Sequence, residues 1–184
     1  RAHLFSYRSV HGTLDENAAA LAQFIEEKGV DGAHLVGHSL GGVLALRMLA
    51  NYDDSLPGRV VCLGSPLTGS RAAQILGAKE WAENLIGRSL PTGVIDESAN
   101  TWASHVCEER DIGVIAGNVP LGFGRLVAKF DDDNDGAIAV SETRLAGARD
   151  HMVMPVSHKG MLVSSDVADQ AGSFLKRGEF LRDT

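Results

Sequence analysis

Residues 33–50 constrain the fold of this chain more than any other segment. A short apolar run at 33–36 leads into Gly37-His38-Ser39-Leu40-Gly41, and residues 40–50 continue with apolar side chains at helical spacing and no proline. This order predicts a strand, a sharp glycine turn and a helix. Glycines around Ser39 allow the strand and the helix to approach closely, which leaves the serine in a strained backbone conformation.

Strands and helices alternate along the rest of the chain. Short apolar runs bounded by glycine, proline or charged residues predict strands at 2–7, 60–63, 112–116 and 152–156. Apolar residues at three and four spacing predict helices at 14–28 and 166–176. The sequence therefore predicts an α/β fold, with a mainly parallel sheet covered by helices on both faces.

The chain length of 184 residues suits one domain, which we expect to span 1–184. Within it, residues 70–107 show no clear strand and contain Trp81 and Trp102. We expect this segment to be a small helical cap or lid, with an ordinary surface connection as the alternative.

Charge and composition exclude several classes of protein. A formal net charge of -7 without a basic cluster disfavours nucleic-acid binding, and no apolar run is long enough for a transmembrane helix. The opening residues do not form a signal peptide, so we expect a cytoplasmic location, although Arg1 is compatible with a targeting signal removed upstream. Cys62 and Cys107 have no metal-site spacing and are predicted to be free thiols.

Gly37-His38-Ser39-Leu40-Gly41 matches the Gly-x-Ser-x-Gly turn, which lifts a serine hydroxyl above a sheet. A serine hydroxyl needs a base within hydrogen-bond reach and an acid that orients the base. The expected order along the chain is serine, acid and then histidine. Three histidines follow Ser39: His105, His151 and His158. His158 follows the last predicted strand and is the expected base. His151 precedes that strand, so it is expected at the opposite end of the sheet, and His38 is expected to shape the turn.

The acid is expected in the turn Asp133-Asn134-Asp135-Gly136, which lies between the strand at 112–116 and His158. Asp135 is the favoured residue. The remaining candidates are carboxylates of the same acidic run and one that precedes the strand at 112–116: Asp131, Asp132, Asp133 and Asp111.

With these residues identified, the chain resembles bacterial α/β-hydrolases of the lipase and esterase type. The resemblance runs from about Leu4 to Phe180 and rests on four motifs: Gly-His-Ser-Leu-Gly-Gly from residue 37, Gly-Ser-Pro-Leu-Thr-Gly-Ser from residue 64, Asp135-Gly136 and Ser157-His158-Lys159-Gly160-Met161. It implies hydrolysis of small-molecule or lipid carboxylic esters without a cofactor, with Ser39 as nucleophile, Asp135 as acid and His158 as base. The Leu40 N–H is then expected to stabilise the oxyanion.

The chain departs from the family at its beginning. Such enzymes usually carry an earlier strand that ends in a His-Gly loop and supplies a second oxyanion donor, and that strand is expected to be missing here. His11-Gly12 is the alternative donor loop. Loss of one donor costs about a hundredfold to a thousandfold in turnover, so a catalytically impaired hydrolase is an alternative function. The sheet edge exposed by the missing strand predicts a homo-oligomer.

A function of another class is suggested by residues Asp131 to Glu142. Asp131, Asp133 and Asp135 alternate, Gly136 follows at the bend, and Glu142 closes the run, as in an EF-hand calcium loop. Calcium binding is therefore the alternative function. Against it, the preceding segment contains a proline and two glycines where an entering helix is required: Pro120, Gly122 and Gly124.

Overall fold

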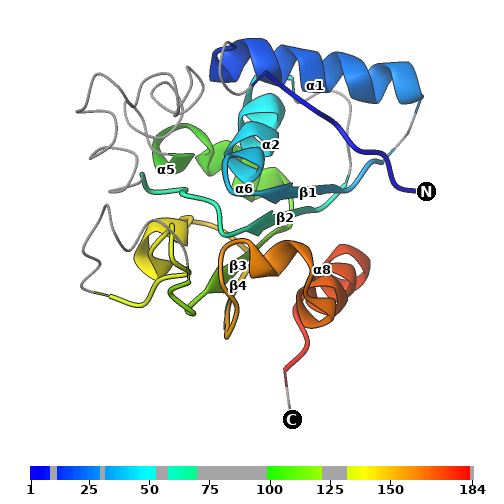
Figure 1. Ribbon diagram of the computed structural model, residues 1–184. Helices are drawn as coiled ribbons and strands as arrows, with labels where there is room; N and C mark the ends of the chain where they lie inside the picture. The colour runs from blue at the N-terminus through cyan, green and yellow to red at the C-terminus, as the bar shows by residue number, and fades with distance from the viewer. Residues whose placement is uncertain (9–11, 30–31, 53–57, 70–98, 122–131, 183–184) are drawn as a thin grey trace.

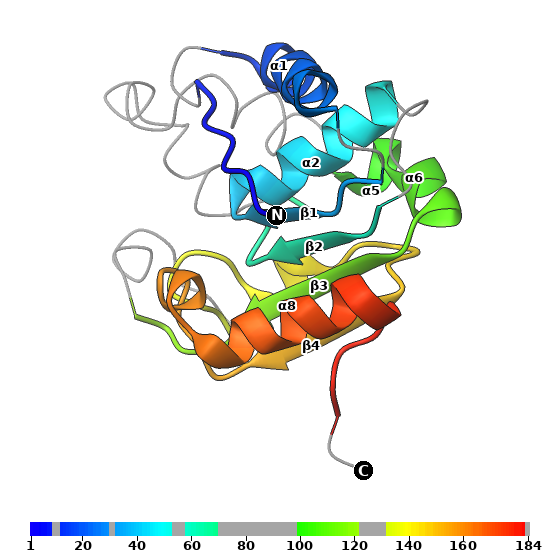
Figure 2. The same cartoon turned by 90° about the vertical axis from the view of Figure 1, so that its right-hand side faces the viewer.

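The computed structural model describes residues 1–8, 12–29, 32–52, 58–69, 99–121 and 132–182. Its centre is a four-stranded sheet formed by β1 (Leu35–His38), β2 (Val60–Leu63), β3 (Ile112–Gly117) and β4 (Asp150–Met154). The strands lie in the order β1-β2-β3-β4, and all three pairings are parallel (Figure 2). The carboxyl ends of all four strands therefore meet at one edge of the sheet.

Helices cover both faces of this sheet (Figure 1). One face carries α1 (Leu14–Lys28), α2 (Leu40–Asn51), α5 (Ala99–Trp102) and α6 (Ser104–Glu109). The other carries α8 (Ser165–Arg177), and two short 3-10 helices, η4 (Val140–Thr143) and η5 (Gly160–Leu162), lie in the connections. The predicted α/β architecture, a parallel sheet between helices, is confirmed.

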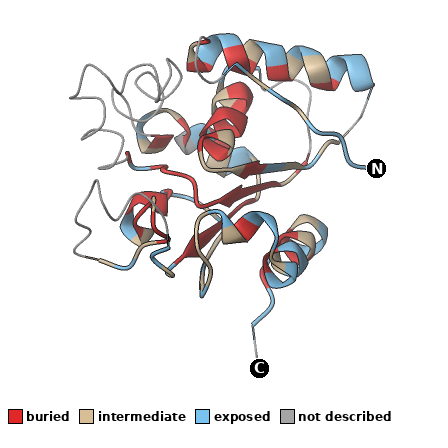
Figure 3. Ribbon diagram, in the orientation of Figure 1, coloured by how far each residue is buried: buried red, intermediate tan, exposed pale blue. Residues whose placement is uncertain are grey.

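The two central strands are buried along their length (Figure 3). Their side chains alternate between two apolar cores. Val60 and Cys62 of β2 pack with the α1 and α2 side, whereas Val61 and Leu63 pack with α8. This period of two is why the strand sequence is apolar at every position. At Gly113 of β3, an added Cβ would lie 2.7 Å from the Phe174 ring, so α8 depends on a glycine for its close approach to the sheet.

The prediction of a strand at 2–7 is wrong, because residues 1–8 contain no strand. Phe5 packs against Phe24 of α1, with ring centroids 5.2 Å apart, while Leu4 is 90% exposed. The apolar residues of this segment thus pack on a helix, and none of its backbone pairs with a described strand. The strands predicted at 33–36 and 152–156 are present but lie at Leu35–His38 and Asp150–Met154.

Of the predicted cap at 70–107, residues 70–98 lie outside the described part of the chain. Residues 99–107 form α5 and the start of α6, whose small apolar side chains pack with α2 in the larger core: Ala99, Ala103 and Val106. The described part of this segment is thus integral to the core. None of the described helices is both long enough and apolar enough to cross a bilayer.

Candidate active site

Ser39 lies at the junction between the end of β1 and the first turn of α2. Its φ of 55° and ψ of −126° make it the one residue other than glycine with positive φ among those described. Such a conformation costs about 1–3 kcal/mol and persists only where the surroundings impose it. The Ser39 N–H donates to the Leu63 carbonyl of β2 at 2.8 Å, which ties the strained residue to the sheet.

Two glycines near Ser39 are sterically required. They are Gly37 and Gly42, whereas the two glycines of the Gly-x-Ser-x-Gly motif are Gly37 and Gly41. An added Cβ on Gly37 would lie 2.4 Å from the backbone of Gly41 and Gly42, and one on Gly42 would lie 2.1 Å from Ser65 Oγ. A Cβ on Gly41 would meet nothing within 4 Å. The close approach of strand and helix therefore depends on Gly37 and Gly42, whereas the second glycine of the motif has free space.

His158 and Asp135 form a hydrogen-bonded pair, with 2.7 Å between His158 Nδ1 and Asp135 Oδ2. The Asp135 side chain is only 1% exposed and that of His158 is 14% exposed. The other carboxylate oxygen, Asp135 Oδ1, accepts hydrogen bonds from the Ala137 and Ile138 N–H groups at 2.9 and 2.8 Å. A carboxylate is acceptor-only, so Nδ1 of His158 carries the proton and Nε2 of a neutral ring presents its lone pair.

Two glycines at the ends of neighbouring strands make room for this pair. Gly64, directly after β2, has φ of 53°, and an added Cβ would lie 3.0 Å from Asp135 Oδ2 and 3.1 Å from His158 Nδ1. Gly117 ends β3, and its added Cβ would lie 2.9 Å from Asp135 Cβ. The pair therefore rests on the carboxyl ends of β2 and β3.

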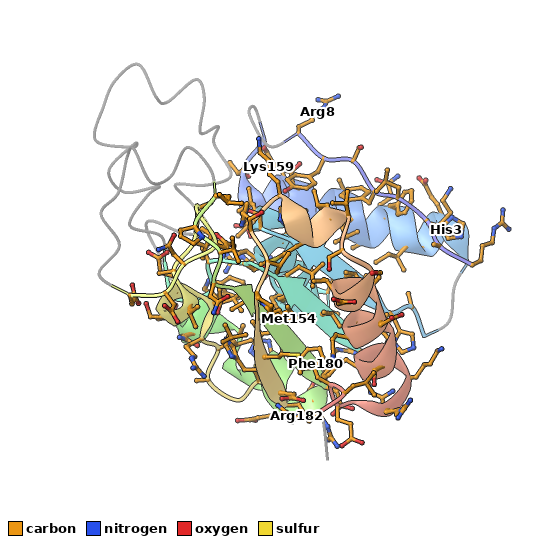
Figure 4. The ribbon with its side chains drawn as sticks, turned by 60° about the horizontal axis from the view of Figure 1, so that its bottom comes forward. His3, Arg8, Met154, Lys159, Phe180 and Arg182 are labelled. Carbon is orange, nitrogen blue, oxygen red and sulfur yellow. The ribbon has the colours of Figure 1, made fainter. Side chains whose placement is uncertain are left out.

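His38 connects this pair to the serine. Its Nε2 lies 2.8 Å from the His158 carbonyl oxygen, and the two imidazole rings lie 4.5 Å apart. In Figure 4, Lys159, which follows His158, lies beyond Met154 at the carboxyl end of β4, while Phe180 and Arg182 lie toward the other end. Ser39, His158 and Asp135 are thus gathered at one edge of the sheet. No hydrogen bond between the Ser39 hydroxyl and the His158 ring is among the described contacts; in unliganded sites such bonds are often long.

Burial lowers the pKa of His38, and the nearby His158 ring lowers it further. His38 is therefore neutral near pH 7. Its role extends beyond the expected one of shaping the turn, since its side chain contacts a residue 120 positions away.

The alternative bases lie elsewhere. His151 is the second residue of β4, at the start of the strand rather than before it, and its Nε2 lies 2.9 Å from Thr143 Oγ1. Burial lowers the pKa of His151, and Arg144 adds to this effect. His105 is in α6, and its side chain is exposed.

The alternative acids are also engaged or remote. Asp111 precedes β3, at the far end of the sheet, and pairs with Arg59 at 2.8 Å and Arg149 at 3.1 Å. Asp132 Oδ2 accepts a hydrogen bond from the Ser141 hydroxyl, and Asp133 is exposed. Asp131 lies outside the described residues.

The calcium interpretation requires Asp135 and Glu142 as ligands, and both carboxylates have other partners. Asp135 binds His158 and two backbone amides, while Glu142 is buried and accepts the Ala139 N–H at 2.9 Å. Within the described ranges, no group of three or more potential metal ligands occurs. The described part of the acidic run thus bonds the imidazole and its own turn.

For the oxyanion, Leu40 is the first residue of α2, where backbone N–H groups have no partner inside the helix. The hypothesis that His11-Gly12 supplies a second oxyanion donor is less favoured, because the Gly12 N–H already donates to the Arg8 carbonyl at 2.8 Å. His11 lies outside the described residues. Cys62 and Cys107 are free, as predicted, and burial raises the pKa of Cys62 to about 12.

Three residues have roles at the site that were not predicted from the sequence. Gly64 and Gly117 support the Asp–His pair, and His38 bonds the His158 backbone. A glycine directly after each of two predicted strands was the only available signal for the first two, because a close approach at a strand end often requires a residue without a side chain.

Several known proteins are similar to this chain. The family model for the alpha/beta hydrolase fold matches residues 4–86. The (lyso)-N-acylphosphatidylethanolamine lipase of Bos taurus is 28% identical over 132 residues, which are 69% of this chain and 36% of that protein. The Homo sapiens lipase of the same name is 29% identical over 52% of this chain and 29% of its own length. The chain thus spans about a third of these relatives.

Solved structures share the fold over most of the chain. The mature Bacillus licheniformis lipase BlEst2 gives a TM-score of 0.63 at 19% identity, covering 91% of this chain and 75% of its own. A lipase-esterase related protein from Clostridium acetobutylicum gives 0.61 at 12% identity, covering 90% and 81%. Together with the matched family model, these similarities show that the chain has the α/β-hydrolase fold.

Proposed function

We propose that this chain hydrolyses carboxylic esters through an acyl-enzyme on Ser39, with His158 as general base and Asp135 as the acid that orients it. The main support is the 2.7 Å hydrogen bond between His158 and a buried Asp135, held against the residue that precedes the strained Ser39. A serine with positive φ at a strand-to-helix turn and a neighbouring His–Asp pair are the components that serine hydrolases require.

In the first half-reaction, Ser39 Oγ attacks the ester carbonyl carbon and its proton passes to His158 Nε2. The carbonyl oxygen becomes an oxyanion, to which the Leu40 N–H donates. The tetrahedral intermediate then expels the alcohol, which takes the proton from Nε2, and an acyl ester remains on Ser39.

In the second half-reaction, His158 Nε2 removes a proton from water, and the oxygen attacks the acyl carbon. Collapse of this intermediate releases the carboxylic acid and returns the proton to Ser39 Oγ. Throughout the cycle, Asp135 keeps the proton on Nδ1 of His158 and stabilises the imidazolium that forms. The chemistry uses only residues of this chain and proceeds without a cofactor.

For the substrate we propose an ester with an apolar acyl group, such as a lipid. This choice is supported by the names of the relatives, which are lipases, and by two exposed apolar residues, Leu162 and Val163, a few positions after His158.

The experiment is to label the purified chain with a fluorophosphonate probe, which reacts with activated serines, and to compare wild type with Ser39→Ala. We expect labelling of the wild type and none of the variant. Labelling of Ser39→Ala at the wild-type rate, or an unlabelled wild type that is folded, would contradict the proposal.

A series of p-nitrophenyl esters separates an active enzyme from a catalytically impaired relative with the same fold. We expect hydrolysis to increase from acetate to longer acyl chains and to disappear in Ser39→Ala. A folded wild type that hydrolyses none of these esters would support the impaired form, in which the second oxyanion donor is lacking.

A further inference from the structure

We infer that His38 is a positioning residue for His158, which fixes the base relative to the serine by a hydrogen bond to its main chain. The inference rests on the proposed function. His38 directly precedes Ser39, and its Nε2 lies 2.8 Å from the His158 carbonyl oxygen. The same residue therefore connects the strand that carries the serine to the loop that carries the base.

The partner defines the tautomer of His38. A carbonyl oxygen only accepts hydrogen bonds, so the Nε2 of His38 must carry a proton and donate it. The two rings also lie in contact, at 4.5 Å between centroids and an interplanar angle of 45°. His38 thus restrains both the backbone and the ring of His158.

The other described hydrogen bonds of His158 are made with Asp135. Its Nδ1 bonds Asp135 Oδ2, and its N–H donates to the Asp135 carbonyl at 2.9 Å. Both bonds hold the imidazole to the loop before β4, and neither reaches the β1–α2 junction where Ser39 lies. Among the described hydrogen bonds, the one from His38 is the bond that joins this junction to His158, so its loss should change the distance between base and nucleophile.

The test compares His38→Phe, which keeps a ring but has no donor, with His38→Gln, whose amide nitrogen can occupy the position of Nε2. His151→Phe is the matched control, because His151 is also half-buried and bonded by its Nε2 but lies at the start of β4. We expect His38→Phe to lower kcat for a p-nitrophenyl ester about 10- to 100-fold with little change in KM, since misplacing a catalytic group by about 1 Å has such an effect. We expect His38→Gln to recover most of this loss and His151→Phe to retain the wild-type kcat.

A proton NMR measurement gives a second readout that does not require activity. The His158 Nδ1 proton, shared with Asp135, should give a low-field resonance in the wild type. We expect it to broaden and exchange faster with water in His38→Phe and to sharpen again in His38→Gln. Unchanged kcat and an unchanged resonance in a folded His38→Phe variant would overturn the inference.

Nitrogen chemical shifts of the wild-type protein test the same bond without a variant, in case His38→Phe does not fold. They report which ring nitrogen of His38 carries the proton. A proton on Nε2 supports the inference, and a proton on Nδ1 overturns it. If the wild type hydrolyses no ester, the proposed function fails, whereas these NMR results still decide whether His38 holds His158.

Discussion

At the scale of single residues, the site depends on polar side chains and on glycines that leave space for them. Asp135 is buried, and both of its carboxylate oxygens accept hydrogen bonds, one from an imidazole and the other from two backbone amides. A buried carboxylate without such partners would be strongly destabilising. The glycines at 64 and 117 leave the space in which this pair lies.

We predict that Asp135→Asn lowers kcat by about three to four orders of magnitude while the chain remains folded. The amide can still accept the Ala137 and Ile138 N–H groups, but its NH₂ would donate to Nδ1 of His158 and move the ring proton to Nε2. Ester hydrolysis and circular dichroism measure the two effects. Asp133→Asn, an exposed neighbour that was an alternative acid, should retain full activity. If Asp133→Asn lost activity and Asp135→Asn retained it, the acid would be Asp133.

We predict that Gly64→Ala impairs both stability and activity. At φ of 53° an alanine is strained by about 1 kcal/mol, and its Cβ would lie 3.0 Å from Asp135 Oδ2 and 3.1 Å from His158 Nδ1. Gly29→Ala is the matched control, because φ is 57° there and a Cβ meets nothing within 4 Å. Urea unfolding should show a loss in both variants, larger in Gly64→Ala, and only Gly64→Ala should slow ester hydrolysis. Equal activity in the two variants would show that Gly64 does not support the pair.

At the scale of elements, the β1–α2 junction holds the serine because strand and helix touch. Gly37 of β1 and Gly42 of α2 permit this contact, and Gly42 also faces the fully buried Ser65 after β2. The conformation of Ser39 is therefore imposed by three elements, β1, α2 and the turn after β2.

We predict opposite effects for the adjacent substitutions Gly41→Ala and Gly42→Ala. Gly41→Ala should stabilise the protein by up to about 1 kcal/mol, because alanine favours the helix and no atom lies within 4 Å of its Cβ. Gly42→Ala should destabilise it by about 1–3 kcal/mol, because its Cβ would overlap Ser65 Oγ. Melting temperatures of the two variants measure this difference, and a Gly42→Ala variant as stable as Gly41→Ala would refute the packing argument.

At the scale of the whole molecule, stability should depend on histidine protonation. Burial lowers the pKa of both His38 and His151 below the ordinary 6.5, so the unfolded chain binds protons more readily than the folded one. By linkage, both residues favour folding above pH 6.5, and this contribution is lost as the pH falls through their folded pKa values. We predict a lower melting temperature at pH 5.5 than at pH 7.5 and a smaller difference in His151→Gln. An identical pH response in wild type and variant would exclude a contribution from His151.

The sheet edge at β1 leads to a prediction about assembly. The Leu35 and Ser39 N–H groups point toward β2, so by alternation those of Val36 and His38 point away from it. Val36 is 53% exposed, and in the described part of the chain β1 pairs only with β2. We predict a concentration-dependent dimer in sedimentation experiments that Val36→Lys disrupts, because edge lysines oppose strand pairing. Val153→Lys, on β4 at the opposite edge, should leave it intact; a chain that is monomeric at high concentration would contradict the prediction.

The sequence by itself determined the order of elements, the parallel sheet and the serine turn, because these follow from local spacing of apolar residues and glycines. The helix at Leu14–Lys28 was predicted to the residue, and Asp135, the favoured acid, forms a hydrogen bond with His158. Only the tertiary structure decided that residues 2–7 pack on α1 without joining the sheet, and that His38 contacts His158. Both depend on which distant segments become neighbours, and backbone pairing and side-chain contacts across 120 residues leave no periodic pattern in the chain.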